Sequence, residues 1–315
     1  MIIQPRKLAP IVVYVYNRPE HFKKCIDALA ANTLASESEL YVVSDGAACI
    51  EHQVAVDQVR EIALAAKGFL KVHLMFRETN WGVYKSATKA DREVVEKHGR
   101  IICLEDDIVT APTFLEFINA GLDYFEDDKR ICSIAGYCHP IPFPADYTEQ
   151  FWFSLVHIPW GFGTWKDRYN SLDPSWNPLP EIKKNWRVYG NMFRYCTWLL
   201  SLLEADARGR VVAGDARVAG QMLLRGQLTV APKISRAKNI GFDGSGLHCA
   251  TDPLGDGVTL NNDLASGVSF SRNVDVDYRV VKAFNAQISS PSDQVKVVRE
   301  AAGLMGFAQW LKRKL

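Results

Sequence analysis

Three adjacent acids, Glu105, Asp106 and Asp107, follow a short apolar run, Ile101 to Leu104, that carries no other charge. Ionised carboxylates this close repel one another, so they cost free energy unless a positive group lies beside them. A divalent cation is the simplest compensation, because Mg²⁺ and Mn²⁺ prefer carboxylate, phosphate and water oxygens. The alternative is a solvated acidic turn that starts the next helix. The position directly after a predicted strand favours the metal site.

A fourth acid, Asp215, lies between Gly214 and a helix that we predict to begin at Ala216. A carboxylate at this place is commonly an N-cap that accepts backbone N–H groups. It could equally act as a general base towards a hydroxyl, a role that typically contributes about 10²–10⁴ in rate. The residue types alone favour the cap.

Asp45 and the glycine-rich run 241–248 are weaker signals when each is taken alone. Asp45 either accepts the N3–H of a uracil ring or forms a turn with Gly46. The glycines of the run would allow a lid to close over a diphosphate. His248, at its end, is either a metal or phosphate ligand or a structural histidine.

Two tryptophans, Trp160 and Trp165, lie in a stretch that is dense in Gly and Trp. Aromatic faces suit the C–H-rich faces of sugar rings, so either residue could stack on a sugar. Burial in the hydrophobic core is an equally good explanation for both.

The elements that must position these residues alternate between strand and helix over the first hundred positions. Short apolar runs predict strands at 11–16, 40–44, 72–76 and 101–104, and apolar residues at helical spacing predict the helices between them. This alternation predicts an α/β fold with a mainly parallel sheet flanked by helices. Ligands bind beyond the carboxyl ends of such strands, and that is where the candidate residues fall.

The chain changes character after Asp107. Further strands are predicted at 131–135, 151–157 and 228–231, and further helices after Pro112, at 192–207 and at 216–225. We expect one domain in two halves, 1–107 and 108–273, followed by a C-terminal tail, 274–315. The tail from Gln294 onward has the pattern of an amphipathic helix.

The bulk composition limits the partners and the compartment. Lys and Arg total 37 against 36 Asp and Glu, a net charge of +1 that argues against a nucleic-acid partner. The seven cysteines are odd in number and contain no C-x-x-C pair, so reduced thiols in the cytoplasm are expected. We expect no signal peptide and no membrane span. Any membrane contact would be peripheral, at the inner face, through the C-terminal helix, although such helices more often pack on their own domain.

Taken together, these segments resemble the GT-A glycosyltransferases, and specifically the branch that contains N-acetylglucosaminyltransferase I. The resemblance covers about residues 8–250 and respects order and spacing. Its matching segments are 10–18, 42–46, 81–85, 104–107, 159–165, 214–215 and 234–241 up to His248.

The resemblance implies a role for each matching residue. Arg18 and Asp45 would face the nucleoside, and Glu105 and Asp106 would meet the donor sugar and the ribose. The other implied positions are Lys85 and Trp160 for the nucleotide sugar, Asp107 and His248 for the metal, and Asp215 for the base.

The implied reaction is an inverting, Mn²⁺- or Mg²⁺-dependent transfer of a sugar from a UDP-sugar, with UDP-N-acetylglucosamine as one candidate. The acceptor would be a hydroxyl of a saccharide or glycolipid in polysaccharide biosynthesis. The first half of the domain would then bind the nucleotide sugar, and the second half would bind the acceptor and carry the base. In the family that the chain resembles, the base has aromatic neighbours in the sequence, and Asp215 does not. Trp186 or Trp198 could take the place of these aromatic residues.

Three alternatives remain open from the sequence. A sugar-1-phosphate nucleotidyltransferase could share the layout, although it would usually have a glycine-rich loop where Asn17-Arg18-Pro19 stands here. A catalytically silent sugar-binding protein on the same fold would not need intact acids at 105–107. A retaining transferase differs from an inverting one in the anomeric configuration of its product.

Overall fold

The computed structural model describes residues 8–244, 258–263, 269–270, 274–289, 293 and 295. Its main sheet has eight strands in the order β3-β2-β1-β4-β8-β6-β9-β7, and a small second sheet pairs β10 with β5. The strands are β1 Ile11–Val15, β2 Glu39–Ser44, β3 Lys71–Phe76, β4 Arg100–Glu105, β5 Ile108–Thr110, β6 Ile131–Ala135, β7 Phe151–Ser154, β8 Phe162–Trp165, β9 Leu228–Pro232 and β10 Ala237–Asn239. The helices are α1 Pro19–Ala30, α2 Ile50–Leu64, α3 Val83–His98, α4 Phe114–Tyr124, α5 Lys166–Ser171, α6 Leu179–Lys184, α7 Trp186–Tyr195, α8 Thr197–Ala207, α9 Gly214–Arg225 and α10 Tyr278–Ile288.

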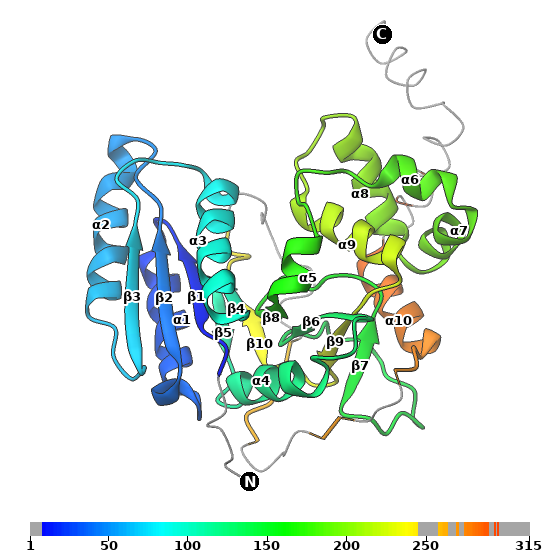
Figure 1. Cartoon of the computed structure of the whole chain (residues 1–315), viewed down its shortest axis with the longest axis horizontal. Coiled ribbons are helices and arrows are strands. Elements are labelled where there is room, and N and C mark those ends of the chain that lie inside the picture. Colours follow the sequence, from blue (N-terminus) through cyan, green and yellow to red (C-terminus); the bar gives the residue numbers. More distant parts are fainter. Residues whose placement is uncertain are drawn as a thin grey trace, which may run out of the picture.

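The main sheet is mixed but mainly parallel, and helices flank it (Figure 1). β1 pairs in parallel with both β2 and β4, and β2 pairs in parallel with β3. β8 lies antiparallel between β4 and β6, whereas β9 is parallel to β6 and antiparallel to β7. The predicted α/β architecture is therefore confirmed.

Alternation along the strands explains why both faces of the sheet are covered. In β1, Ile11 and Val13 pack into the larger hydrophobic core, which includes Phe22 of α1, while Val12 packs into a smaller core with Val94 of α3. Successive side chains of a strand point to opposite faces, so a strand that is apolar throughout needs a helix on each side. Together the two cores fix the carboxyl ends of the parallel strands in space.

Three sequence-based boundaries were wrong. The helix predicted at 192–207 is two helices, because Cys196, with φ −144° and ψ 46°, breaks it and the Thr197 N–H donates to Asn285 Oδ1 of α10 at 3.2 Å. The strand predicted at 151–157 ends at Ser154. The helix predicted to begin at Ala216 begins at Gly214, after an N-cap at Ala213.

Helices α6 to α9 gather at the end of the molecule opposite β3 and α2 (Figure 1). The beginning of the tail forms α10, whose Phe284 packs on Trp152 of β7 with ring centroids 5.3 Å apart. The amphipathic segment predicted from Gln294 lies, apart from Val295, outside the described residues. The division of the chain at residues 107 and 273 stays a prediction. Among the described residues, no helix combines the length and apolar character that crossing a bilayer requires.

A buried carboxyl joins three elements on one face of the sheet. Asp91 of α3 accepts hydrogen bonds from the hydroxyls of Tyr14 in β1 and Tyr169 in α5, the latter at 3.1 Å. Burial raises the pKa of Asp91 from an ordinary value of 3.8 to about 7, although both hydroxyls act in the opposite direction. The folded protein therefore holds this proton more tightly than the unfolded chain does.

We predict that Asp91→Asn flattens the pH dependence of stability. The stability linked to the Asp91 proton is complete below pH 3.8 and is lost as the pH rises through about 7. Between pH 4 and 7 the wild-type free energy of unfolding should fall relative to the variant by about 2–4 kcal/mol, measured by urea denaturation. Asp27→Asn, at an exposed site on α1, is the control and should keep the wild-type slope. Parallel curves for wild type and Asp91→Asn would contradict the prediction.

Candidate functional site

Residues that follow β1, β2 and β4 meet at one edge of the sheet, because these strands are parallel and adjacent. Arg18 lies between β1 and α1, Asp45 follows β2, and Glu105 is the last residue of β4. Asp106 and Asp107 form the turn between β4 and β5. The structure therefore brings the predicted acids and the predicted arginine together.

Arg18 forms ion pairs with two of the three acids. Its Nη2 contacts Asp106 Oδ1 and lies 2.9 Å from Asp107 Oδ2. Pro19 begins α1 and restricts the backbone of Arg18, which has φ −119° and ψ 74° and from which the side chain departs. Burial raises the pKa of Asp106 to about 6, and Arg18 opposes that rise. A guanidinium thus supplies the positive charge that the acids require.

Asp107 keeps one oxygen available for a further ligand. Its Oδ1 is buried and has no hydrogen-bond partner among the described residues, whereas Oδ2 faces Arg18. A buried carboxylate oxygen is normally satisfied, so an unpaired one indicates a missing donor or cation. Within the described part of the chain, no three His, Cys, Asp or Glu side chains are grouped to hold a metal alone. Asp107 therefore suits a cation that takes its other ligands from a bound molecule.

Gly241 lies directly against the ion pair. A Cβ added there would overlap Asp107 Oδ2 and would lie 3.0 Å from Arg18 Nη1. The segment is held in place because the Ile240 N–H donates to the Asp107 carbonyl at 2.9 Å and β10 pairs with β5. His21 Nε2 also lies 3.1 Å from Asp243 Oδ2. The first half of the predicted lid thus borders the acids, whereas His248 lies outside the described residues.

Glu105 has an exposed side chain, yet its pKa is raised to about 8. The protein packed around the carboxyl is the main cause, and the negative charges of Asp107, Asp215 and Asp106 add to it. The contribution of Asp215 shows that α9 carries this acid towards the end of β4. An exposed carboxyl with such surroundings is typical of a functional site.

Asp215 is the second residue of α9 rather than its N-cap, and its side chain is exposed. The helix has no side-chain cap, so the expectation that Asp215 serves as the N-cap was wrong. A carboxylate in the first turn of a helix interacts favourably with the helix dipole. An exposed acid near Glu105 is suited to accept a proton from a bound hydroxyl.

Tyr84 is a site residue that residue-type reasoning missed. It lies in the first turn of α3, and its ring would be 2.9 Å from a Cβ placed on Gly214. Burial and the charge of Asp215 raise the pKa of Tyr84, while the Gly214 backbone and Arg217 oppose the rise. Tyr84 therefore packs against the start of α9 and positions Asp215. In the sequence, only its place in the matching segment 81–85 pointed to a role in the site.

Asp45 holds a loop in place. Its Oδ1 accepts the N–H groups of Gly46 at 3.0 Å and Trp81 at 2.9 Å, and its Oδ2 accepts that of Gly82 at 2.8 Å. The buried carboxylate thereby fixes the segment before α3, which carries Tyr84 and Lys85. The expected contact with a uracil ring stays a prediction, and it would have to share oxygens that already accept backbone groups.

Lys85 and Arg77 both contact the ring of Trp81. The Lys85 Nζ lies 5.1 Å from the ring centroid, and the Arg77 guanidinium carbon lies 4.6 Å from it. Two side-chain nitrogens of Arg77, Nε and Nη2, are buried without a hydrogen-bond partner among the described residues. Both cations are thus held next to the loop that Asp45 fixes, where they would favour an anionic ligand.

The two tryptophans of 159–165 differ. Trp165 is a core residue: its side chain is buried and its Nε1 donates to the Leu122 carbonyl at 3.1 Å. Trp160 is partly buried, and its ring lies edge-on to Phe242, with centroids 5.5 Å apart, next to Gly241. The structure therefore leaves Trp160 as the candidate for a sugar contact.

Comparison with known proteins gives no family for the chain. No protein-family model and no curated protein matches it. It is similar to a solved structure of S. aureus TarS residues 1–349, with 13% identity over 73% of this chain and 59% of that one, at a TM-score of 0.42. It is also similar to S. aureus TarS, at 15% identity over 49% and 28% of the two chains and a TM-score of 0.33.

A third similar structure is the WbbM bifunctional glycosyltransferase, at 10% identity over 42% and 24% of the two chains and a TM-score of 0.26. The chain spans less than two thirds of the length of each of these solved chains. Likeness of this degree assigns no activity, so the function must be argued from the site itself.

We predict that Gly241→Ala weakens cation binding at Asp107. The new methyl group must displace the Asp107 carboxylate or the backbone that borders it. In the presence of UDP, Mn²⁺ affinity measured by electron paramagnetic resonance should fall about 10–100-fold, as is usual when the support of a metal ligand is disturbed. Gly190→Ala is the control, because a Cβ there meets nothing within 4 Å. Equal Mn²⁺ affinity in Gly241→Ala and wild type would contradict the assignment.

Proposed function

We propose that the chain is a metal-dependent, inverting glycosyltransferase that moves a sugar from a UDP-sugar to a hydroxyl of a saccharide or glycolipid. The observation that carries this proposal is the pairing of a buried, unsatisfied Asp107 oxygen with an exposed Asp215 near Glu105. The first feature suits a cation and a diphosphate, and the second suits an acceptor hydroxyl. Sugar transfer from a nucleotide diphosphate requires both.

Asp107 would hold the cation, and the chemistry of its oxygen fits Mn²⁺ or Mg²⁺. His248 remains a proposed second ligand from the sequence. A bound cation would neutralise the negative charge that builds on a leaving diphosphate. Arg18 would contribute to the same neutralisation. The Arg18 guanidinium would bind phosphate oxygens in the same planar manner in which it binds the carboxylates.

Asp215 would act as the general base. Its carboxylate takes the proton of the acceptor hydroxyl as the oxygen attacks the anomeric carbon. The bond between that carbon and the diphosphate oxygen breaks at the same time, and UDP leaves with the electron pair. Attack from the face opposite the diphosphate inverts the anomeric configuration. Tyr84, packed against Gly214, keeps the first turn of α9 in position for this step.

The remaining parts of the proposal concern the donor and the surroundings. Asp45, Lys85 and Trp160 would bind the nucleotide sugar, and Glu105 and Asp106 would contact the sugar and the ribose. UDP-N-acetylglucosamine is the proposed donor. A cytoplasmic place, proposed from the odd and scattered cysteines, and a role in polysaccharide biosynthesis, proposed from the resemblance, complete the proposal.

One structural feature disfavours a nucleotidyltransferase. Such an enzyme needs a flexible, glycine-rich loop after the first strand to surround a triphosphate. Here only three residues, 16–18, separate the end of β1 from the start of α1 at Pro19, and none of them is glycine. No comparable loop fits at this point of the chain.

We predict that Asp107→Asn abolishes the metal dependence of donor binding. The amide keeps the shape of the side chain but removes the charge that attracts the cation. A thermal-shift panel of UDP-, GDP- and dTDP-sugars, each with and without Mn²⁺, should show a Mn²⁺-dependent shift for wild type with a UDP-sugar and none for the variant. Asp27→Asn should behave as wild type. Unchanged Mn²⁺ dependence in Asp107→Asn would remove Asp107 from the metal site.

We predict that Asp215→Asn retains donor binding but loses transfer. Removal of a general base typically lowers the rate about 10²–10⁴-fold. UDP release would be measured with the donor from the thermal-shift panel and a panel of saccharide acceptors, and proton NMR of the product would report the anomeric configuration. Asp127→Asn, an exposed acid on the loop after α4, is the matched control. Near-normal turnover in Asp215→Asn, or a product with retained configuration, would contradict the base role.

A further inference from the structure

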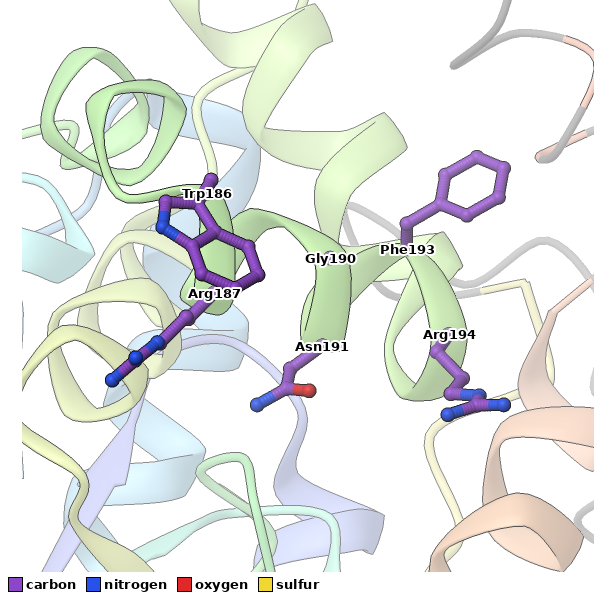
Figure 2. A pocket seen from close by; sticks show the side chains of 6 residues that line it. All are labelled: Trp186, Arg187, Gly190, Asn191, Phe193 and Arg194. Carbon is purple, nitrogen blue, oxygen red and sulfur yellow. The ribbon is translucent and has the colours of Figure 1, made fainter.

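Helix α7 has an outer face that no described segment covers. Its inner face packs through buried Met192 and partly buried Val188 and Tyr189 against the core. Its outer residues line an open hollow on the surface of the α6–α9 end, far from β3 and α2 (Figures 1 and 2). The helix is therefore anchored on one side and available on the other.

Two aromatic side chains project from this outer face. Trp186 is 75% exposed and Phe193 is 42% exposed. They are seven positions apart, so they lie on the same side of the helix about 10 Å from each other. Gly190 lies between them along the helix and contributes no side chain there (Figure 2). Two large exposed rings beside polar and charged residues are typical of an interaction surface.

A cationic stripe runs beside the aromatic one. Arg187 and Arg194, with Asn191 between them, project together from the helix (Figure 2). The Arg187 guanidinium lies 5.3 Å from the Trp186 ring centroid. Lys184 adds an exposed charge, whereas Lys183 is paired with Glu204 at 2.6 Å. The sequence from 182 to 203 contains no Asp or Glu, so nothing within it balances these charges.

We propose that this outer face of α7 docks on an anionic phospholipid surface. Tryptophan and phenylalanine rings insert at the boundary between headgroups and acyl chains, while neighbouring arginines stay in contact with the phosphates. Each basic side chain near an anionic bilayer raises binding about fivefold. A neutral saccharide chain fits less well, because it carries no negative charge to balance Arg187, Arg194 and Lys184.

This surface is distinct from the segment that the sequence suggested for membrane contact. That segment begins at Gln294, whereas α7 precedes it by a hundred residues and is part of the folded domain. The proposal also does not depend on sugar transfer, because it rests on exposure and charge alone.

The test is co-sedimentation of the full chain with two kinds of vesicle, phosphatidylcholine alone and phosphatidylcholine with 30% phosphatidylglycerol. Wild type should bind the anionic vesicles only, and binding should weaken with salt. Arg187→Gln with Arg194→Gln should lower the partition coefficient about 10–30-fold. Trp186→Ala with Phe193→Ala should lower it about tenfold or more.

Lys67→Gln with Lys71→Gln, exposed basic residues at the α2 and β3 end, is the matched charge control and should bind as wild type. Circular dichroism would confirm that all variants are folded. Failure of wild type to bind, or equal binding by wild type and both α7 variants, would overturn the proposal. The proposal would also be overturned if both α7 variants still bound the vesicles but no longer bound soluble polyphosphate. The outer face of α7 would then bind an anionic polymer rather than a membrane.

Discussion

The charge balance at the end of β4 is the constraint on which the site depends. Glu105 ends β4 after the apolar run 101–104, and Asp106 and Asp107 follow it in a turn and are buried. Arg18 reaches across from the neighbouring parallel strand and compensates part of that charge. Burial raises the pKa values of Glu105 and Asp106, and the neighbouring carboxylates add to the rise, while Asp107 keeps an unsatisfied oxygen. The free protein thus holds a site with excess negative charge, and binding a cation would relieve it.

The sequence predicted the first half of the fold well, because its strands are short apolar runs separated by helices with one apolar face. The second half was harder to predict. β8 contains Gly163, against which Ile118 packs so closely that a side chain would not fit, and such a strand has no apolar signature. The break at Cys196 was also hidden, because it depends on Asn285 of α10, far away in the sequence.

The candidate site also has residues that the sequence could predict and residues that it could not. Arg18 and the acids at 105–107 could be placed from the sequence, since parallel strands deliver their carboxyl ends to one edge. Tyr84 could not be singled out, because its importance comes from contact with Gly214, which is distant in sequence. Asp45 shows a further limit: the sequence allowed a ligand contact or a turn with Gly46, but it could not show that the same carboxylate also holds the N–H groups of Trp81 and Gly82 before α3.

The small ribbon of β5 and β10 gives the site an unusual dependence on distant chain segments. It joins the residues after Asp107 to a segment more than a hundred positions later, and the Ile240 N–H and Gly241 then lie on the acid itself. A fragment that ended after β9 would keep all eight strands of the main sheet yet lack one wall of its charged corner. The charged corner therefore depends on a chain segment that the main sheet itself does not contain.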